Sequence, residues 1–220
     1  MEKRIGVLLS GCGVMDGTEI HEAVLTLYFL QKAGAEIICM AQDKDQRDVI
    51  NHLGNAPVAE EKRNIMTESA RIARGKIRDV SAVKAEELDA LVIPGGCGAI
   101  KNLSSFAVDG AACEVDENVR ILLRELYKNK KPIGALCLSP IVVAAVFGKI
   151  CAPEITIGSD DSIAAALEVM GARHKTVASD EIVIDSENGI ITCPCYMTAQ
   201  NIGEVGAGIE KLIEKIMEMV

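Results

Sequence analysis

The chain has 220 residues, of which 49% are hydrophobic and only 3% aromatic, and its formal net charge is −9. This length suits one domain (1–220), and a core of Ile, Val, Leu and Ala is typical of parallel α/β sheets. The acidic balance, with no basic patch, excludes a nucleic-acid surface, and no apolar run reaches membrane-spanning length. We therefore expect a cytoplasmic domain whose eight cysteines are thiols.

Strand and helix patterns alternate along the chain. In the first half we expect strands at 4–9, 36–41, 76–79 and 90–93, helices at 17–33 and 63–74, and an irregular polar region at 43–61. In the second half we expect helices at 116–129, after Cys137, at 159–170 and at 200–219, and strands at 133–136, 154–157, 175–177, 182–185 and 189–193. The last strands resemble an antiparallel pair. The alternation predicts a doubly wound, mostly parallel sheet sandwiched by helices.

The segment 131–140 is the most informative part of the sequence. A short apolar strand ends on Cys137, and Ser139 and Pro140 suit the N-cap and first position of a helix. This pattern predicts a strand-to-helix elbow, where free backbone N–H groups and a helix dipole lower a thiol pKa. On this segment alone, a buried structural cysteine is an equally good interpretation.

Two further segments fall at the carboxyl ends of strands, where doubly wound sheets bind their ligands. They are the Gly-rich loops 10–13 and 94–98. The Gly95–Gly96 pair allows a tight turn, and beside Cys137 its amides would form an oxyanion hole together with that of Leu138. The convergence of the three segments favours a site at this edge.

Glu22 borders the apolar stripe of the first helix. A buried carboxyl there would hydrogen-bond the cysteine or move protons. The pattern alone favours an exposed first-turn acid that complements the helix dipole, as we expect for Glu19.

A dinucleotide site is a weaker alternative. In this interpretation, the glycines at 11, 13 and 17 would bind the pyrophosphate and Asp43 or Asp45 would bind the ribose. The glycine spacing, however, departs from GxGxxG. Asp16 would also bring negative charge towards a pyrophosphate.

The remaining cysteines and histidines point to no metal site. Cys193-Pro-Cys195 lacks a partner pair for zinc and is interpreted as a strand end with a loop. Cys12 and Cys97 either face the same pocket as Cys137 or pack their loops. No histidine falls just after the Cys137 helix. His21 is a candidate for the pocket rim, His52 lies in a polar loop, and His174 is expected at the surface.

Three motifs resemble the nucleophile elbow, oxyanion loop and helix-borne acid of the DJ-1/PfpI superfamily: Ala135-Leu-Cys137-Leu-Ser-Pro140, Ile93-Pro-Gly-Gly96 and Gly17-Thr-Glu-Ile-His-Glu22. Within it, the chain is similar to the ElbB-type isoprenoid-biosynthesis glyoxalase branch and its mitochondrial vertebrate relatives. The segments that carry this likeness include Ser10–Gly13, Asp48–His52, Glu68–Gly75, Lys101–Ser104 and Tyr196–Asn201.

The resemblance implies a flavodoxin-like fold, Cys137 as nucleophile, Glu22 as its acid/base partner, and Gly96 and Leu138 as oxyanion-hole amides. Many members of the superfamily place a histidine in the loop after the nucleophile helix, but here residues 155–160 contain none. We therefore expect glyoxalase-type lyase chemistry on a small aldehyde, without metal or cofactor. A cysteine redox sensor or partner-binding protein is the alternative, and an amidotransferase-like hydrolase is less favoured. The surface is compatible with a homodimer.

Overall fold

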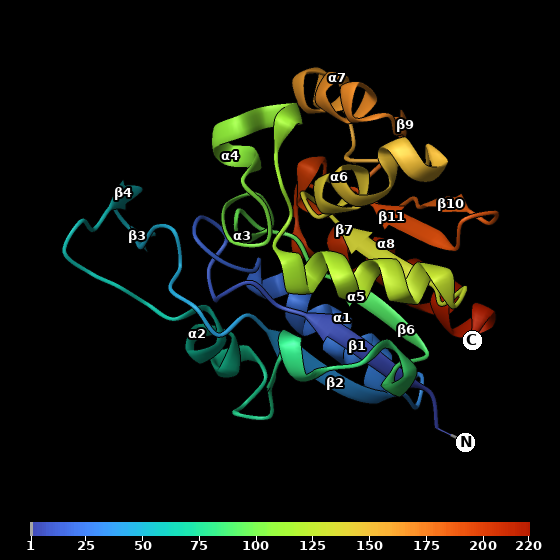
Figure 1. Ribbon diagram of the computed structural model, residues 1–220, viewed down its shortest axis with the longest axis horizontal. Helices are drawn as coiled ribbons and strands as arrows, with labels where there is room; N and C mark the ends of the chain where they lie inside the picture. The colour runs from blue at the N-terminus through green and yellow to red at the C-terminus, as the bar shows by residue number, and fades with distance from the viewer. Residues whose placement is uncertain (1) are drawn as a thin grey trace.

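The computed structural model describes residues 2–220 and contains a seven-stranded sheet (Figure 1). The strand order is β10-β11-β7-β6-β1-β2-β5, and every neighbouring pair is parallel except β10 and β11. The expected doubly wound, mostly parallel sheet is thus confirmed. The strands are β1 (Arg4–Leu8), β2 (Glu36–Ala41), β5 (Arg78–Asp79), β6 (Ala90–Ile93), β7 (Ile133–Leu136), β10 (Val183–Asp185) and β11 (Ile190–Cys193).

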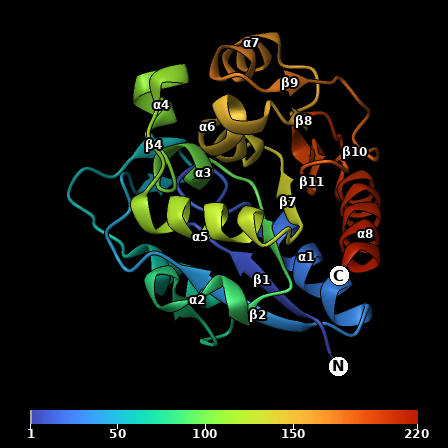
Figure 2. The ribbon, with the colours of Figure 1, turned by 45° about the vertical axis from the view of Figure 1, so that its right-hand side comes forward.

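Helices cover both faces of the sheet (Figure 2). One buried cluster joins the sheet to α1 (Ile20–Lys32), α2 (Ile65–Ile72) and α8 (Ile202–Met219), and the other joins it to α5 (Glu117–Lys128), α6 (Pro140–Cys151) and α7 (Asp161–Met170). Short helices α3 (Gly98–Lys101) and α4 (Phe106–Asp109) follow β6. None of the helices within residues 2–220 is long and apolar enough to cross a bilayer.

Two small strand pairs lie outside the main sheet. β3 (Ile50–Asn51) and β4 (Ala56–Pro57) form an antiparallel pair in the region expected to be irregular, on an arm that projects from the body (Figure 1). β8 (Glu154–Ile155) pairs in parallel with β9 (Arg173–His174). The strand expected at 175–177 is therefore wrong, because pairing with β8 places the strand earlier in the chain. The expected antiparallel hairpin β10–β11 is confirmed.

The first helix begins later than the pattern predicts. Residues 17–19 form a loop instead, in which the Gly98 N–H donates to Gly17 O at 2.8 Å and the Glu19 N–H donates to Gly95 O at 2.9 Å. These bonds join the start of α1 to the loop after β6. The helix that carries Glu22 is thereby fixed against the Gly-Gly turn.

Helix α8 packs directly on β7, the strand that ends at Cys137. A Cβ at Gly134 would lie 2.7 Å from Ile216 Cδ1 and 3.0 Å from Leu212 Cδ2. The absence of a side chain at this position therefore sets how closely α8 approaches β7.

Replacement of Gly134 by Val should lower the free energy of unfolding by about 1–3 kcal/mol, because it overpacks this interface. Urea denaturation measures the change. Val169→Ala, at a side chain that is 73% exposed on α7, is the control and should change stability by less than about 0.5 kcal/mol. Equal stability of the Gly134→Val variant and the wild type would contradict the packing described here.

Candidate active site

Four adjacent strands place their carboxyl ends at one edge of the sheet. In the order β11-β7-β6-β1, they lead into the turn 194–197, Cys137, the loop 94–98 and the loop 10–13. Because these strands are neighbours, their following loops meet. The structure therefore brings together the three segments singled out in the sequence and adds a fourth, the turn 194–197.

Cys137 lies at the elbow between β7 and α6. Its φ is +55°, a left-handed conformation that is costly for a residue with a side chain, and the residue is only 5% exposed. Its N–H donates to Cys193 O at 2.9 Å. Ser139 stands before α6 as predicted, but its side chain does not cap the helix: its Oγ donates to Pro94 O at 2.7 Å. The serine therefore ties the elbow to the Gly-Gly turn.

Glu22 points into the site and is fully buried. The Gly95 N–H donates to its Oε2 at 2.9 Å and the Tyr196 N–H donates to its Oε1 at 3.4 Å. The side chains of Glu22 and Cys137 both lie against Gly95, and each shifts the pKa of the other. The interpretation of Glu22 as an exposed first-turn acid is wrong. So is that of Glu19, which is buried and accepts the Glu22 N–H at 2.7 Å as the N-cap. The late start of α1 turns both acids inward.

Burial sets the acidity of both central groups. Burial, with a contribution from nearby Glu19, raises the pKa of Glu22 to about 8. Burial and the charge of Glu22 raise the pKa of the Cys137 thiol well above its ordinary value, although hydrogen bonds from the Gly96 and Leu138 amides act in the opposite direction. The expected lowering of the thiol pKa is therefore wrong, because desolvation outweighs the amide donors.

The Gly-Gly turn leaves no room for side chains. A Cβ at Gly95 would lie closer than 3.0 Å to both Cys137 Cβ and Glu22 Oε2. Gly96 has a φ of +98°, and a Cβ there would collide with the backbone of residues 17–19. Both glycines therefore allow the main chain to approach the thiol and the carboxyl, which explains how the Gly96 amide reaches the sulfur.

The turn after β11 is the part of the site that sequence reasoning missed. Cys195 is fully buried and has a φ of +45°, and the next residue, Tyr196, donates its N–H to Glu22. The side chain of Tyr196 also reaches α1, where its hydroxyl hydrogen-bonds His21 Nδ1 at 2.7 Å. As expected, strand β11 ends at Cys193 and a turn follows. The left-handed backbone conformation of Cys195, however, could not be predicted from the sequence.

No imidazole within residues 2–220 hydrogen-bonds Cys137. His21 is exposed and bonded to Tyr196, and His52 accepts the Met15 N–H at 3.2 Å on another loop. His174 is half-buried instead of lying at the surface, and burial lowers its pKa; it accepts the Ile157 N–H at 3.4 Å. In the loop after α6, a Cβ at Gly158 would lie 2.5 Å from Thr198 Cγ2. Because Gly158 also has a φ of +84°, a side chain at that position would be strained.

Cys12 and Cys97 are half-buried, and burial raises the pKa of both thiols. The charged groups that act most on Cys12 are Glu68 and Arg71 of α2, and Lys101 acts most on Cys97; Asp16 raises the pKa of both. Cys12 therefore lies near α2, and Cys97 near the start of α3.

The dinucleotide alternative does not fit the structure. The N-cap of α1, where a pyrophosphate would bind, is the carboxylate of Glu19. Asp16 is buried and accepts the Ile50 N–H at 2.7 Å. A Cβ at Gly17 would lie 2.5 Å from Cys12 N, so the glycine loop is packed on itself.

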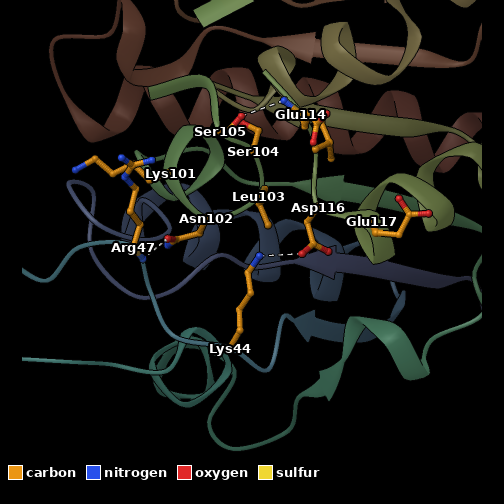
Figure 3. Close-up of a pocket in the computed structure, with 11 residues that line it drawn as sticks. Lys44, Arg47, Lys101, Asn102, Leu103, Ser104, Ser105, Glu114, Asp116 and Glu117 are labelled. Carbon is orange, nitrogen blue, oxygen red and sulfur yellow. Dashed lines mark hydrogen bonds and ion pairs between the residues drawn. The ribbon is translucent and has the colours of Figure 1, made fainter. Parts of the chain in front are cut away.

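A groove of about 430 Å³ lies beside these loops (Figure 3). Two of the cations that line it pair with acids: Lys44 with Asp116 at 2.8 Å and Lys101 with Asp48 at 3.0 Å. Asn102, in its floor, donates to Ser10 O at 2.8 Å and to Asp16 O at 2.9 Å. The Asn102 bonds hold the loop after β1, and none of the contacts in this groove involves Cys137 or Glu22.

Curated relatives cover nearly the whole chain. A rat protein named "ES1 protein homolog, mitochondrial" is 40% identical over 98% of this chain and 84% of its own length. The human "Glutamine amidotransferase-like class 1 domain-containing protein 3, mitochondrial" is 40% identical over 98% of this chain and 83% of its own length. These mitochondrial names contradict the expected cytoplasmic location. An acidic composition suits any aqueous compartment, so it does not distinguish one from another.

Solved structures share the fold. An isoprenoid biosynthesis protein with an amidotransferase-like domain from Ehrlichia chaffeensis superimposes with a TM-score of 0.92 at 39% identity, covering 99% of both chains. Schizosaccharomyces pombe DJ-1 superimposes with a TM-score of 0.59 at 18% identity, covering 96% of this chain and 90% of its own, which shows the fold alone. Residues 12–194 match the DJ-1/PfpI family. The chain therefore belongs to the DJ-1/PfpI family.

Proposed function

We propose that the protein converts glyoxal or a related α-oxoaldehyde into the corresponding hydroxy acid, with Cys137 as nucleophile and Glu22 as acid/base partner. One observation carries this proposal. A buried carboxyl of raised pKa lies beside the thiol, while no imidazole of residues 2–220 hydrogen-bonds it. The thiol proton thus has one acceptor in the site, the carboxylate of Glu22.

The reaction begins when Glu22 takes the thiol proton and the Cys137 sulfur adds to one aldehyde carbon. The resulting hemithioacetal oxyanion lies beside the Gly96 and Leu138 amides, which already point at the sulfur. Glu22 then moves a proton from the sulfur-bearing carbon to its neighbour through an enediol, so the first carbon reaches the thioester level as the second becomes an alcohol. Water cleaves the thioester and restores the thiol. One water is consumed, and no external oxidant or reductant is needed.

The same geometry favours aldehydes over amides. Hydrolysis of an amide requires protonation of a poor leaving amine, a task that a histidine performs in cysteine hydrolases. The loop after α6 supplies no such group, because residues 155–160 contain no histidine. An aldehyde addition has no leaving group, so the Cys137–Glu22 pair suffices for its first step.

Cys137→Ala and Cys137→Ser should abolish conversion of glyoxal to glycolate, because both remove the thiol that forms the hemithioacetal. Cys97→Ser, at a half-buried thiol next to the Gly-Gly turn, is the matched control and should retain turnover. Glycolate is measured by chromatography, with glutamine as a second substrate that should not be hydrolysed. Full turnover in Cys137→Ala would sink the proposal. Selective peroxide oxidation at Cys137, without aldehyde turnover, would favour the redox-sensor alternative.

The pH dependence of turnover should follow Glu22. Its carboxylate form accepts the thiol proton, so kcat/KM for glyoxal should rise as the pH increases through about 8. Glu22→Gln has the same shape and no titrating carboxyl, so the variant should lose this rise together with most activity. A pH profile that is flat from pH 6 to pH 9 in the wild type would rule out Glu22 as the base.

The raised pKa of Glu22 also predicts a pH dependence of stability. The folded protein holds this proton up to about pH 8, whereas the unfolded chain releases it near the ordinary value of 4.5. The stabilisation is therefore complete below the unfolded pKa and is lost as the pH rises towards the folded pKa. The free energy of unfolding of the wild type, relative to Glu22→Gln, should fall by about 1.4 kcal/mol per pH unit between roughly pH 5 and pH 8. Urea denaturation at several pH values measures it, and parallel curves would contradict it.

A further inference from the structure

Tyr196 contacts helix α1 at two adjacent residues. Its backbone N–H donates to Glu22 Oε1 at 3.4 Å, and its hydroxyl hydrogen-bonds His21 Nδ1 at 2.7 Å. The rings of Tyr196 and His21 also lie against each other, with centroids 5.8 Å apart. Tyr196, in the turn after β11, is therefore hydrogen-bonded to the helix that carries Glu22.

The two contacts differ in strength. The bond to His21 has an ordinary length, whereas 3.4 Å is near the limit for an N–H···O bond. The Gly95 N–H holds the other oxygen of Glu22 at 2.9 Å. A small outward movement of the turn would break the bond to Oε1 first, leaving the carboxyl held on one side only.

We propose that Tyr196 is a positioning residue for Glu22, held in place by the bond between its hydroxyl and His21. The proposal rests on the Cys137–Glu22 pair of the proposed function. Tyr196 acts through its backbone N–H, so its side chain matters because it fixes where that N–H lies. The buried left-handed residue before it, Cys195, fixes the same turn from the inside.

The bond to His21 tolerates either charge state of the imidazole. A neutral ring accepts from or donates to the phenol, and a protonated ring donates to the phenol oxygen. The other titratable groups that face Glu22 are Glu19 at the N-cap of its helix, Cys137 at the elbow and Cys195 in the turn. Loss of the Tyr196 N–H would remove a donor to the carboxylate and so raise the pKa of Glu22 further.

The test uses Tyr196→Phe, which removes the hydroxyl but keeps the ring and the N–H. Tyr28→Phe, at a 59% exposed tyrosine on α1, is the matched control. His21→Phe breaks the same bond from the other side, and His21→Gln restores an acceptor for the phenol. The full-length variants are first compared by thermal unfolding. His21→Phe and His21→Gln carry the test if Tyr196→Phe does not fold.

The readout is the pH dependence of Cys137 alkylation by iodoacetamide, followed by peptide mass spectrometry, which requires no aldehyde turnover. Tyr196→Phe and His21→Phe should move the Glu22-dependent midpoint to higher pH and slow alkylation below it by about threefold to tenfold. His21→Gln and Tyr28→Phe should match the wild type. A Tyr196→Phe profile that superimposes on the wild type would overturn the proposal. An absence of glyoxal turnover in the wild type would instead overturn the proposed function and leave this result standing.

Discussion

The structure of the site depends on one buried carboxyl. Glu22 has no contact with solvent, and each of its oxygens accepts one backbone N–H, from Gly95 on one side and from Tyr196 on the other. Two donors are too few to offset the loss of water, so the carboxyl keeps its proton to about pH 8. The charged form of Glu22 lowers the stability of the fold, and its carboxyl lies against a thiol. Both features suit a role in proton transfer better than a role in folding.

Backbone conformation makes this arrangement possible. Cys137 and Cys195 have side chains yet adopt positive φ, and Gly96, after the next strand β6, does so as well. These turns end adjacent strands and aim amide N–H groups at the sulfur and the carboxyl. Strained residues at neighbouring strand ends are characteristic of functional sites, where the surrounding packing offsets the free-energy cost of the strained backbone. The interface of β7 with α8 and the bond from Ser139 to Pro94 O provide part of that support.

The fold was predictable because it follows from the alternation of strand and helix patterns and from the apolar strands, both of which can be recognised in the local sequence. The order β7-β6-β1 then made the meeting of Cys137 with Gly95 and Gly96 a consequence of topology. Two features were not predictable. The orientation of Glu22 depends on where α1 begins, and that is set by contacts with the loop after β6. The direction of the Cys137 pKa shift depends on how deeply the thiol is buried, and the strand-to-helix pattern in the sequence does not indicate this.

The central claim is that Glu22 holds its proton near neutral pH beside the Cys137 thiol. A carbon-13 NMR titration of the labelled Glu22 carboxyl, assigned with Glu22→Gln, tests it most directly. The account predicts a midpoint near pH 8, and a still higher midpoint in Cys137→Ala, because the Cys137 thiol favours the charged carboxylate. A midpoint near the ordinary value of 4.5 would contradict the account.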